Sequence, residues 1–191
     1  ATPQPTWGAY VTVDQVEAAA DRARRHGGAV CVPPMDIPGT GRFAALADPT
    51  GAVLMPFVYA GDEPDKSNVF GQPGTFIWNE LLTDDAPRAA RFYGEVFGWS
   101  TREQDMGPIG TYTLFGHKGR DVAGAMKRPA ALPANQWLYY VAVTDVDQKL
   151  AQAQSRGATA LGQPQDIPGI GRMVQLKDPQ GALLALFKPQ R

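Results

Sequence analysis

Few residues in this chain could carry out metal or nucleophilic chemistry. The sequence contains two histidines and a single cysteine, Cys31, which excludes a structural thiolate cage for zinc and any disulfide within the chain. His26 precedes a glycine that is expected to end a helix, and His117 stands in the turn-like stretch GHKGR. Both are therefore interpreted as structural or solvated residues. No Ser-His-Asp set, Cys-His pair or P-loop is recognisable.

Glu80 is the acidic residue best placed for chemistry. It follows Trp78 by two positions in the apolar run TFIWNELLT, so both side chains are expected on the same face of a strand. A carboxylate on an apolar face could act as a general base. Alternatively, Glu80 could pair with Arg172 or another cation and hold two parts of the sheet together.

The composition narrows the class of protein. The chain has 191 residues, a formal net charge of -1 and 43% hydrophobic residues, which is enough for at least one domain with a real core. The charge balance argues against nucleic acid or a membrane surface as the main partner, because both need a basic face. No apolar run approaches the roughly 20 residues that span a bilayer. A lone cysteine fits a reducing compartment, so a cytoplasmic location is expected.

An internal repeat organises the chain. DIPGTGRFAALADPTGA starts at Asp36, and DIPGIGRMVQLKDPQGA starts at Asp166, an offset of 130 residues. Aligned at this offset without a gap, residues 7–57 and 137–187 are identical at roughly 20 of about 50 positions, which indicates a duplicated structural unit. The repeated DIPG-x-GR phrase is interpreted as a hairpin, because no helix follows its glycines as a dinucleotide loop would require.

Each copy predicts the order β-α-β-β-β. An aromatic and β-branched strand is followed by an Ala- and Gln-rich helix that should stop at Gly27 or Gly157, and three strands follow. The middle of the chain has the same order, with a helix in DDAPRAARFYGEVFG that should begin near Asp84 or Asp85. The sequence therefore predicts three units, at about residues 5–58, 74–128 and 135–189.

These phrases resemble a known superfamily. WNELLTDDAPRAARFYGEVFGW resembles the opening unit of a glyoxalase/bleomycin-resistance module, and YVAVTDVDQKLAQAQSRGA with DPQGALLALF resembles its closing unit. The superfamily is also called vicinal oxygen chelate and includes dioxygenases. The resemblance covers nearly the whole chain and is greatest to tandem two-module bacterial members. It implies an α+β fold of repeated βαβββ units, with an eight-stranded curved mixed sheet per paired module and helices on the outer face.

The resemblance also implies an incomplete module. Residues 75–191 supply a complete module from units 75–128 and 135–189, and residues 60–74 form a linker. Residues 1–59 look like the C-terminal half of another module whose partner half is absent. An unpaired half would leave an apolar sheet edge in water. We therefore expect a homo-oligomer or association with a missing N-terminal half, as in truncation of a parent of about 250 residues.

The metal site that the resemblance implies lacks its ligands in this sequence. In the family, one ligand lies seven residues before the Asp that opens each helix, and another lies seven residues after the Asp of DP-x-G. Counting along this chain gives positions that cannot ligate a hard cation: Gly8, Met55, Trp78, Leu138 and Ala185. We expect no native metal, although a divalent ion at a displaced site is the alternative.

The concave face of the complete module is the predicted binding site. Strand alternation places a set of mostly apolar and aromatic side chains there, with one acid and one amide. Such surfaces suit a flat, partly aromatic ligand, although aromatic side chains on a sheet are also ordinary core residues. The candidate ligand-binding residues are Trp78, Glu80, Tyr112, Leu138, Tyr140 and Gln175.

Three functions remain open from the sequence. The first is binding of a small, partly aromatic molecule without metal or other cofactor. The second is a lyase, isomerase or dioxygenase-like enzyme acting on a small oxygenated metabolite, with Glu80 as base or a noncanonical metal. The third is a structural or regulatory module for protein contacts. One fold hosts many activities, so the fold does not choose among them.

Overall fold

A computed structural model describes residues 5–62, 71–107 and 110–190 of the chain. The expected α+β class and the βαβββ order of all three repeats are confirmed. The middle of the expected linker, residues 63–70, lies outside the described residues. Within the described part, none of the helices has the length and apolar character needed to cross a bilayer.

The helices and strands follow the repeats in order. The first repeat consists of β1 (Tyr10–Thr12), α1 (Val16–Arg25), β2 (Ala29–Ile37), β3 (Gly41–Ala47) and β4 (Val53–Tyr59). The middle repeat consists of β5 (Phe76–Thr83), α2 (Ala86–Phe97), β6 (Ser100–Asp105), β7 (Thr111–His117) and β8 (Arg120–Lys127). The last repeat consists of β9 (Gln136–Ala142), α3 (Val146–Gln154), β10 (Thr159–Ala160), β11 (Gln165–Ile167), β12 (Gly171–Lys177) and β13 (Leu183–Pro189).

The helix boundaries follow the local signals in the sequence. Asp85 is the N-cap of α2, and its carboxylate accepts a hydrogen bond from the Arg88 backbone N–H at 3.0 Å. Gly98 ends that helix in the left-handed conformation at φ 70°. Gly27 and Gly157, after α1 and α3, also have positive φ, as expected.

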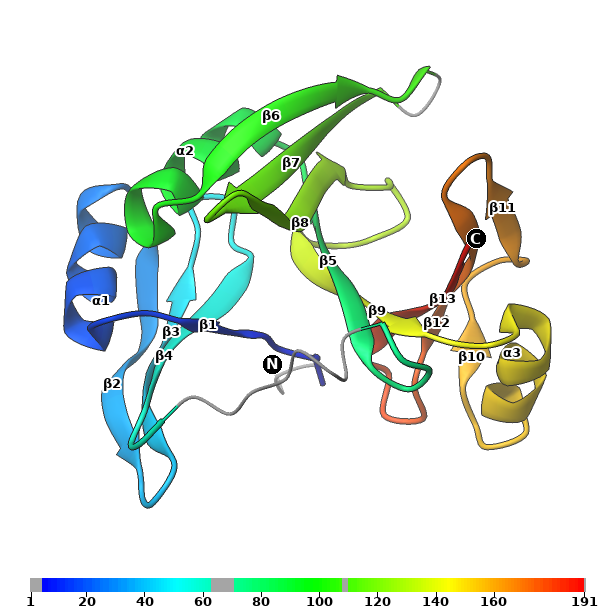
Figure 1. The fold of residues 1–191 in the computed structure, drawn as a ribbon, viewed down its shortest axis with the longest axis horizontal. Helices are drawn as coiled ribbons and strands as arrows, with labels where there is room; N and C mark the ends of the chain where they lie inside the picture. Colours follow the sequence, from blue (N-terminus) through cyan, green and yellow to red (C-terminus); the bar gives the residue numbers. More distant parts are fainter. Residues whose placement is uncertain (1–4, 63–70, 108–109, 191) are drawn as a thin grey trace. The chain divides into compact units, whose positions relative to one another are not determined.

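The first repeat forms a separate four-stranded sheet in the order β1-β4-β3-β2, with β1 parallel to β4 (Figure 1). The helix α1 covers one face of this sheet through small residues that are almost fully buried, Ala19, Ala20 and Ala23. The opposite face carries Tyr10, Phe43 and Phe57 on neighbouring strands. The sheet thus has one face packed on its helix and one aromatic face.

The middle and last repeats share one hydrogen-bonded path of strands, β10-β12-β13-β9-β5-β8-β7-β6, with β11 also paired to β12. We expected eight strands in this sheet, and the described residues form nine. The difference arises because the second strand of the last repeat is divided into β10 and β11, with Gly162 in the gap where the first repeat has Val32. In the first repeat, β2 runs without a break, although its register to β3 shifts twice.

The contacts divide the chain into two compact units, and the boundary between them falls within β5, between Asn79 and Glu80. The N-terminal unit consists of the described residues of 8–64 and 80–137. The C-terminal unit consists of those of 1–7, 65–79 and 138–191. The first repeat is therefore in one compact unit with most of the middle repeat. The division of the chain into a half module and a complete module stays a prediction.

The core of the N-terminal unit combines the first and middle repeats. Helix α1 packs beside α2, as Figure 1 shows. Arg22 of α1 donates hydrogen bonds of 3.0 and 2.9 Å to the Val96 carbonyl, in the last turn of α2. An aromatic cluster fills the space between α2 and the sheet: Phe92, Tyr93, Phe97, Trp99, Phe115 and Trp137.

The C-terminal unit has its own apolar core between α3 and strands β12 and β13. Val146 and Leu150 of the helix contact Val174, Leu176 and Leu186 of the strands. Asp145 caps α3 by accepting a hydrogen bond from the Gln148 backbone N–H at 2.9 Å. Burial of these aliphatic side chains is the main stabilising term for this unit.

Candidate functional site

Glu80 is buried in the sheet of the N-terminal unit. Glu80 is 6% exposed, and the two residues that follow it in β5, Leu81 and Leu82, are fully buried. A carboxylate in such surroundings costs free energy unless polar partners compensate it. The sequence correctly placed Glu80 in a strand two positions after Trp78, which is half-buried.

Tyr112 of β7 reaches Glu80 and donates a hydrogen bond of 2.9 Å from its hydroxyl to Oε1. Gly124 of β8 makes this contact possible, since it is the register partner of Glu80. A Cβ atom at position 124 would lie 2.1 Å from the Tyr112 hydroxyl oxygen. Tyr112 was among the predicted site residues, whereas the requirement for a glycine opposite it was not visible in the sequence.

Three other predicted residues meet in the C-terminal unit. Tyr140 of β9, Ala185 of β13 and Gln175 of β12 are consecutive register partners across three strands. Leu138 is fully buried two positions before Tyr140, and the Phe187 ring lies 6.0 Å from the Tyr140 ring, nearly perpendicular to it. The candidate residues thus form two groups, Glu80 with Tyr112 in one unit and Leu138 with Tyr140 and Gln175 in the other. Their joint role in one binding site stays a prediction.

The sequence left open an ion pair between Glu80 and Arg172. The structure shows two other acidic residues in contact with Arg172. That guanidinium contacts Asp147 at 2.8 Å and Asp166 at 3.0 Å. The same arrangement occurs in the first repeat, where Arg42 contacts Glu17 and Asp36. The aspartate and arginine of the repeated DIPG-x-GR phrase are therefore joined in both copies. This supports an architectural role for the phrase.

The counted metal positions carry side chains that do not fit a hard cation. Gly8 lies next to the Met55 side chain: a Cβ atom added at Gly8 would be 2.5 Å from the Met55 methyl carbon. In the last repeat, Ala185 is the register partner of Tyr140 and lies one strand from Leu138. Within the described residues, no group of three or more His, Cys, Asp or Glu side chains converges. The donors present therefore do not fit the metal that the superfamily commonly holds.

The two histidines lie away from these positions. His26 is the C-cap residue of α1, and its Nε2 atom lies 3.7 Å from a carboxylate oxygen of Glu95. His117 ends β7 beside the turn at Lys118 and Gly119. Cys31 is exposed in β2. These positions agree with the structural or solvated roles expected for the histidines.

A buried polar network in the N-terminal unit was not foreseen from the sequence. The Asp48 carboxylate is 3% exposed and accepts hydrogen bonds from the Tyr93 hydroxyl at 2.8 Å and the Thr50 hydroxyl at 2.7 Å. The Trp137 indole N–H donates to the Tyr93 hydroxyl oxygen at 3.0 Å. Asp48 belongs to the first repeat and Tyr93 to the middle one, so the network joins the two repeats.

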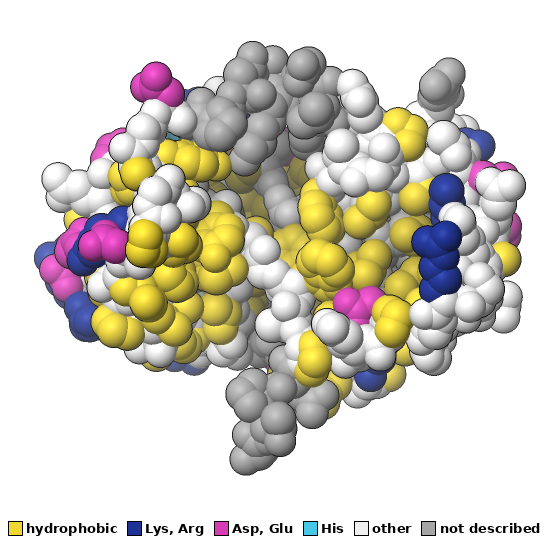
Figure 2. Space-filling view, turned by 90° about the horizontal axis from the view of Figure 1, so that it is seen from below, with side chains coloured by type: hydrophobic (Ala, Val, Ile, Leu, Met, Phe, Trp, Pro, Cys, Tyr) yellow, Lys and Arg dark blue, Asp and Glu magenta, His cyan; other side chains and the backbone are white. Residues whose placement is uncertain are grey.

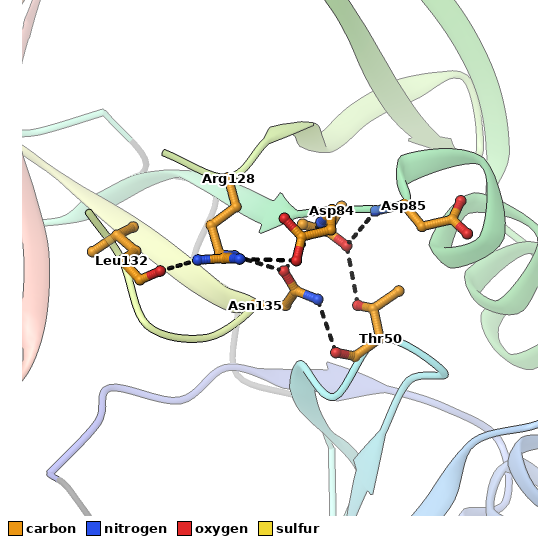
Figure 3. Close-up of polar contacts among 7 residues, drawn as sticks. Thr50, Asp84, Asp85, Arg128, Leu132 and Asn135 are labelled. Carbon is orange, nitrogen blue, oxygen red and sulfur yellow. Dashed lines mark hydrogen bonds and ion pairs between the residues drawn. The ribbon is translucent and has the colours of Figure 1, made fainter. Parts of the chain in front are cut away.

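Figure 3 shows the exposed end of this network. The Asn135 side chain donates to the Thr50 carbonyl oxygen at 2.9 Å and accepts from the Asp84 backbone N–H at 3.0 Å. Arg128 donates to the Asn135 side-chain oxygen and to the Leu132 carbonyl, and forms an ion pair of 2.9 Å with Asp84. Each of these polar groups has a partner within the network. This arrangement suits a structural clamp rather than a reaction centre.

An open groove of about 670 Å³ also lies in the N-terminal unit, along the exposed side of α2. Charged side chains of both signs line it, including Arg88, Arg91, Glu95 and Glu103. None of the predicted site residues contributes to its lining. The groove therefore differs from the predicted site in position and in polarity.

The sequence and structure match known proteins over most of the chain. The family model for the glyoxalase/bleomycin resistance protein/dioxygenase superfamily matches residues 3–55 and 75–186. "Putative glyoxylase CFP32" of Mycobacterium tuberculosis is 35% identical over 185 residues, which cover 97% of this chain and 70% of that protein. Anthracycline biosynthesis protein DnrV of Streptomyces peucetius is 32% identical over 183 residues, covering 92% of this chain and 63% of that protein.

Solved structures show the same fold at low sequence identity. A 2,2',3-trihydroxybiphenyl 1,2-dioxygenase from Sphingomonas wittichii superposes with a TM-score of 0.63 at 14% identity, covering 97% of this chain and 71% of that one. A Mn(II)-bound glyoxalase from Novosphingobium aromaticivorans superposes with a TM-score of 0.59 at 16% identity, covering 94% and 61%. The chain belongs to the glyoxalase/bleomycin resistance protein/dioxygenase superfamily.

Proposed function

We propose that this protein binds a small, partly aromatic molecule, without a metal ion, on the sheet face that carries Trp78 and Glu80. The observation that carries the proposal is the buried Glu80 carboxylate, to which Tyr112 donates a hydrogen bond across a glycine. A buried carboxylate with an oriented hydroxyl is suited to fixing a polar group of a ligand.

The aromatic character of the neighbouring candidates supports the class of ligand. Trp78 lies two positions before Glu80 on the same strand, so the indole and the carboxylate share one face of β5. In the C-terminal unit, Gln175 is half-buried beside the buried Tyr140 and Leu138, so its amide is the most accessible of these three groups. A half-buried indole and a carboxylate on one strand suit a planar molecule that is held by stacking and a directed hydrogen bond.

The relatives support the same class. Two Streptomyces relatives are named anthracycline biosynthesis proteins, and anthracyclines are planar, polycyclic aromatic compounds with several hydroxyl groups. The chain covers 63% of the length of these two relatives. The positions where the superfamily commonly holds a metal bear Gly8, Met55, Trp78, Leu138 and Ala185 in this chain, which supports binding without a metal.

The proposal is tested by calorimetric titration of the protein with daunorubicin, an anthracycline, in buffer with and without EDTA. We expect saturable 1:1 binding that EDTA does not change. We expect the Trp78→Ala variant to bind at least about tenfold more weakly, because a stacking ring is lost. Val53→Ala is the control, since Val53 is an exposed apolar side chain of β4 in the first repeat, and its affinity should stay within about twofold. No saturation with daunorubicin, or equal losses in the two variants, would count against the proposal.

A second candidate function is supported by the same carboxylate. A Glu80 side chain in contact with a tyrosine hydroxyl could remove a proton from a carbon next to a carbonyl group. The proton would pass to the carboxylate and be replaced from solvent. Incubation with hydroxyacetone in D2O, followed by NMR, would then show deuterium at the α-carbon. Glu80→Gln should abolish the exchange, whereas Glu103→Gln, on the exposed strand β6, should not.

A further inference from the structure

The groove along the exposed side of α2 has the size of a small-molecule site. Its volume is about 670 Å³, and clefts of roughly 300–1,000 Å³ hold drug-sized ligands. The lining comes from α2, from β6 and the residue before it, from the His26 end of α1 and from Pro49. All of these residues belong to the N-terminal unit, so one compact unit forms the whole groove.

The apolar part of the groove is aromatic. Phe92 of α2 is almost fully buried, and Trp99 is half-buried with its ring 5.6 Å from the Phe115 ring. Gly94 allows α2 to lie close to this segment, because a Cβ atom added there would be 3.3 Å from the Trp99 carbonyl oxygen. A half-buried indole at the edge of a groove can stack against a planar ligand.

Two arginines of α2 that line the groove have no side-chain partner among the described residues. Arg88 and Arg91 are three positions apart in the helix, so their side chains project from the same side of it. Both are exposed, and neither guanidinium forms an ion pair or hydrogen bond with any described residue. The acids of the groove are placed differently, with Glu95 at 3.7 Å from His26 and Glu103 on β6.

The charges at the helix start are balanced in the other two repeats. Helices α1 and α3 carry an acid in the first turn, Glu17 and Asp147, and each acid contacts an arginine of its own repeat. In Figure 2, basic and acidic side chains lie next to one another on the side of α1, beside the hydrophobic side chains of the first repeat. The first turn of α2 has no acid and contains Arg88, where the helix dipole disfavours a cation. The helix itself therefore gains no stability from Arg88.

We propose that this groove binds a small aromatic monocarboxylate, with the carboxylate between Arg88 and Arg91 and the ring against Trp99. A guanidinium group matches a carboxylate with two parallel hydrogen bonds, and two such groups one turn apart can share one carboxylate. Glu103 on β6 repels further negative charge, which favours a single carboxylate over a phosphate or phosphonate group. The candidate ligand residues on the sheet do not line the groove, so this inference does not depend on the proposed function.

Calorimetric titration of the whole chain with cinnamate tests the inference. We expect saturable binding of one cinnamate per chain, with a dissociation constant of about 100 μM for a ligand of this size. Cinnamamide has the same shape without the charge, and styrylphosphonate carries a second negative charge at about pH 8. Each should bind at least about tenfold more weakly than cinnamate. No saturation with cinnamate, or an equal or higher affinity for either analogue, would overturn the proposal.

Variants of exposed arginines locate the binding site. Arg88→Gln and Arg91→Gln should each weaken cinnamate binding at least about tenfold, because charge-assisted hydrogen bonds are lost. Arg156→Gln is the matched control, since Arg156 is also exposed, lies outside the groove and has no ion pair with a described residue; its affinity should stay within about twofold. Circular dichroism establishes that each variant is folded.

The same titrations contain the results that would contradict the proposal. An affinity that both groove variants leave unchanged would overturn it, as would a loss in Arg156→Gln as large as in Arg88→Gln. Loss of cinnamate binding in Trp78→Ala would overturn it as well, because the carboxylate would then occupy the ligand site proposed on the sheet. Failure of daunorubicin to bind, by contrast, would affect only that other site.

Discussion

The turns at residues 48–51 and 178–181 have the same DP-x-G sequence pattern and the same local hydrogen bonds, yet their surroundings differ. In both, the aspartate carboxylate accepts the backbone N–H groups two and four residues later. Asp48 is buried and also accepts from Tyr93 of the middle repeat, whereas Asp178 is partly exposed. The turn of the first repeat therefore also binds the middle repeat through Asp48, whereas the bonds of Asp178 described here are local to its turn.

The difference extends to the helices of the two repeats. Where α3 has Lys149 and Leu150, α1 has Ala19 and Ala20, which are almost fully buried. Gly28, which corresponds to Ala158, lies against the Phe92 ring of α2. The residues that the two repeats share therefore determine the hairpins of both. The residues that differ between them determine which element packs against each repeat.

The largest effect is expected from removing the two turn carboxylates. Asp48→Ala should lower the free energy of unfolding by about 3 kcal/mol, because it leaves the Tyr93 hydroxyl and turn N–H groups without their acceptor. Asp178→Ala removes local turn bonds only and should cost about 1 kcal/mol. Urea denaturation followed by tryptophan emission, with hydrogen exchange to locate the loss, measures both. Equal losses would show that burial of Asp48 is not what distinguishes the turns.

Exchanging the paired positions after the helices should have the next largest effect. A Cβ atom at Gly28 would lie 2.5 Å from the Phe92 ring and 2.6 Å from the Ala47 carbonyl oxygen. Gly28→Ala should therefore cost about 2 kcal/mol through overpacking. The reverse exchange, Ala158→Gly, should cost no more than about 1 kcal/mol. Thermal unfolding of the two variants checks this order, and a neutral Gly28→Ala would argue against close contact of this segment with α2.

A smaller effect is expected at Arg22, whose counterpart in the last repeat is Gln152. Arg22→Gln should cost about 1 kcal/mol, because two hydrogen bonds to the Val96 carbonyl are lost. Gln152→Arg, on the exposed side of α3, should change stability by less than about 0.5 kcal/mol. Chemical denaturation of both variants measures the difference. A loss at Gln152→Arg as large as at Arg22→Gln would contradict the packing described for α1.

The smallest effect concerns a feature that the two repeats share. Hydrogen bonds from Arg42 lower the pKa of Glu17 from its ordinary 4.5, and hydrogen bonds from Arg172 lower the pKa of Asp147 from its ordinary 3.8. A carboxyl group with a lowered pKa in the folded state stabilises the fold above its ordinary pKa, and this contribution is lost as the pH falls through the lowered value. The two carboxylates are exposed and the two guanidinium groups are half-buried, so solvent screens both pairs and the contribution is small.

Glu17→Gln and Asp147→Asn should therefore weaken the fold slightly at pH 7, by similar amounts in the two repeats. The difference from the unchanged protein should shrink as the pH falls below the ordinary pKa values and should disappear once it is below the lowered ones, where the carboxyl groups are protonated. Melting temperatures measured from pH 2 to pH 7 test this. A clear loss in one variant alone would show that the two ion-pair clusters differ in function as well as in sequence.

The repeats, the element order and the helix ends could be predicted because they depend on local signals. Asp85, Gly27 and Gly98 act through their own backbone conformation, which the neighbouring residues determine. The nine-stranded path differs from the expected eight because the second strand of the last repeat is divided into β10 and β11. Pro164 corresponds to Pro34 of the unbroken strand β2, so proline alone does not divide a strand here, whereas Gly162 stands where the first repeat has Val32.

The candidate site was predictable only in part, for a related reason. Strand alternation placed Glu80 beside Trp78, and Tyr112 was included among the candidates. The contact between Glu80 and Tyr112 depends on the absence of a side chain at Gly124, more than forty residues away from Glu80. The Asp48–Tyr93 contact joins two repeats and has no sequence signature. Both are long-range effects of register and packing, which the sequence pattern does not encode locally.

We propose that this chain binds an aromatic ligand without a metal, because the positions at which the superfamily commonly holds one carry side chains that cannot ligate it. The most direct measurement is a calorimetric titration of EDTA-treated protein with daunorubicin, repeated after addition of Mn²⁺, Ni²⁺ or Zn²⁺, with metal content determined on the same sample. We predict one ligand per chain, a dissociation constant that the metals leave unchanged, and no stoichiometric metal. Binding that appears only with a metal, together with one equivalent of that metal in the protein, would contradict the claim.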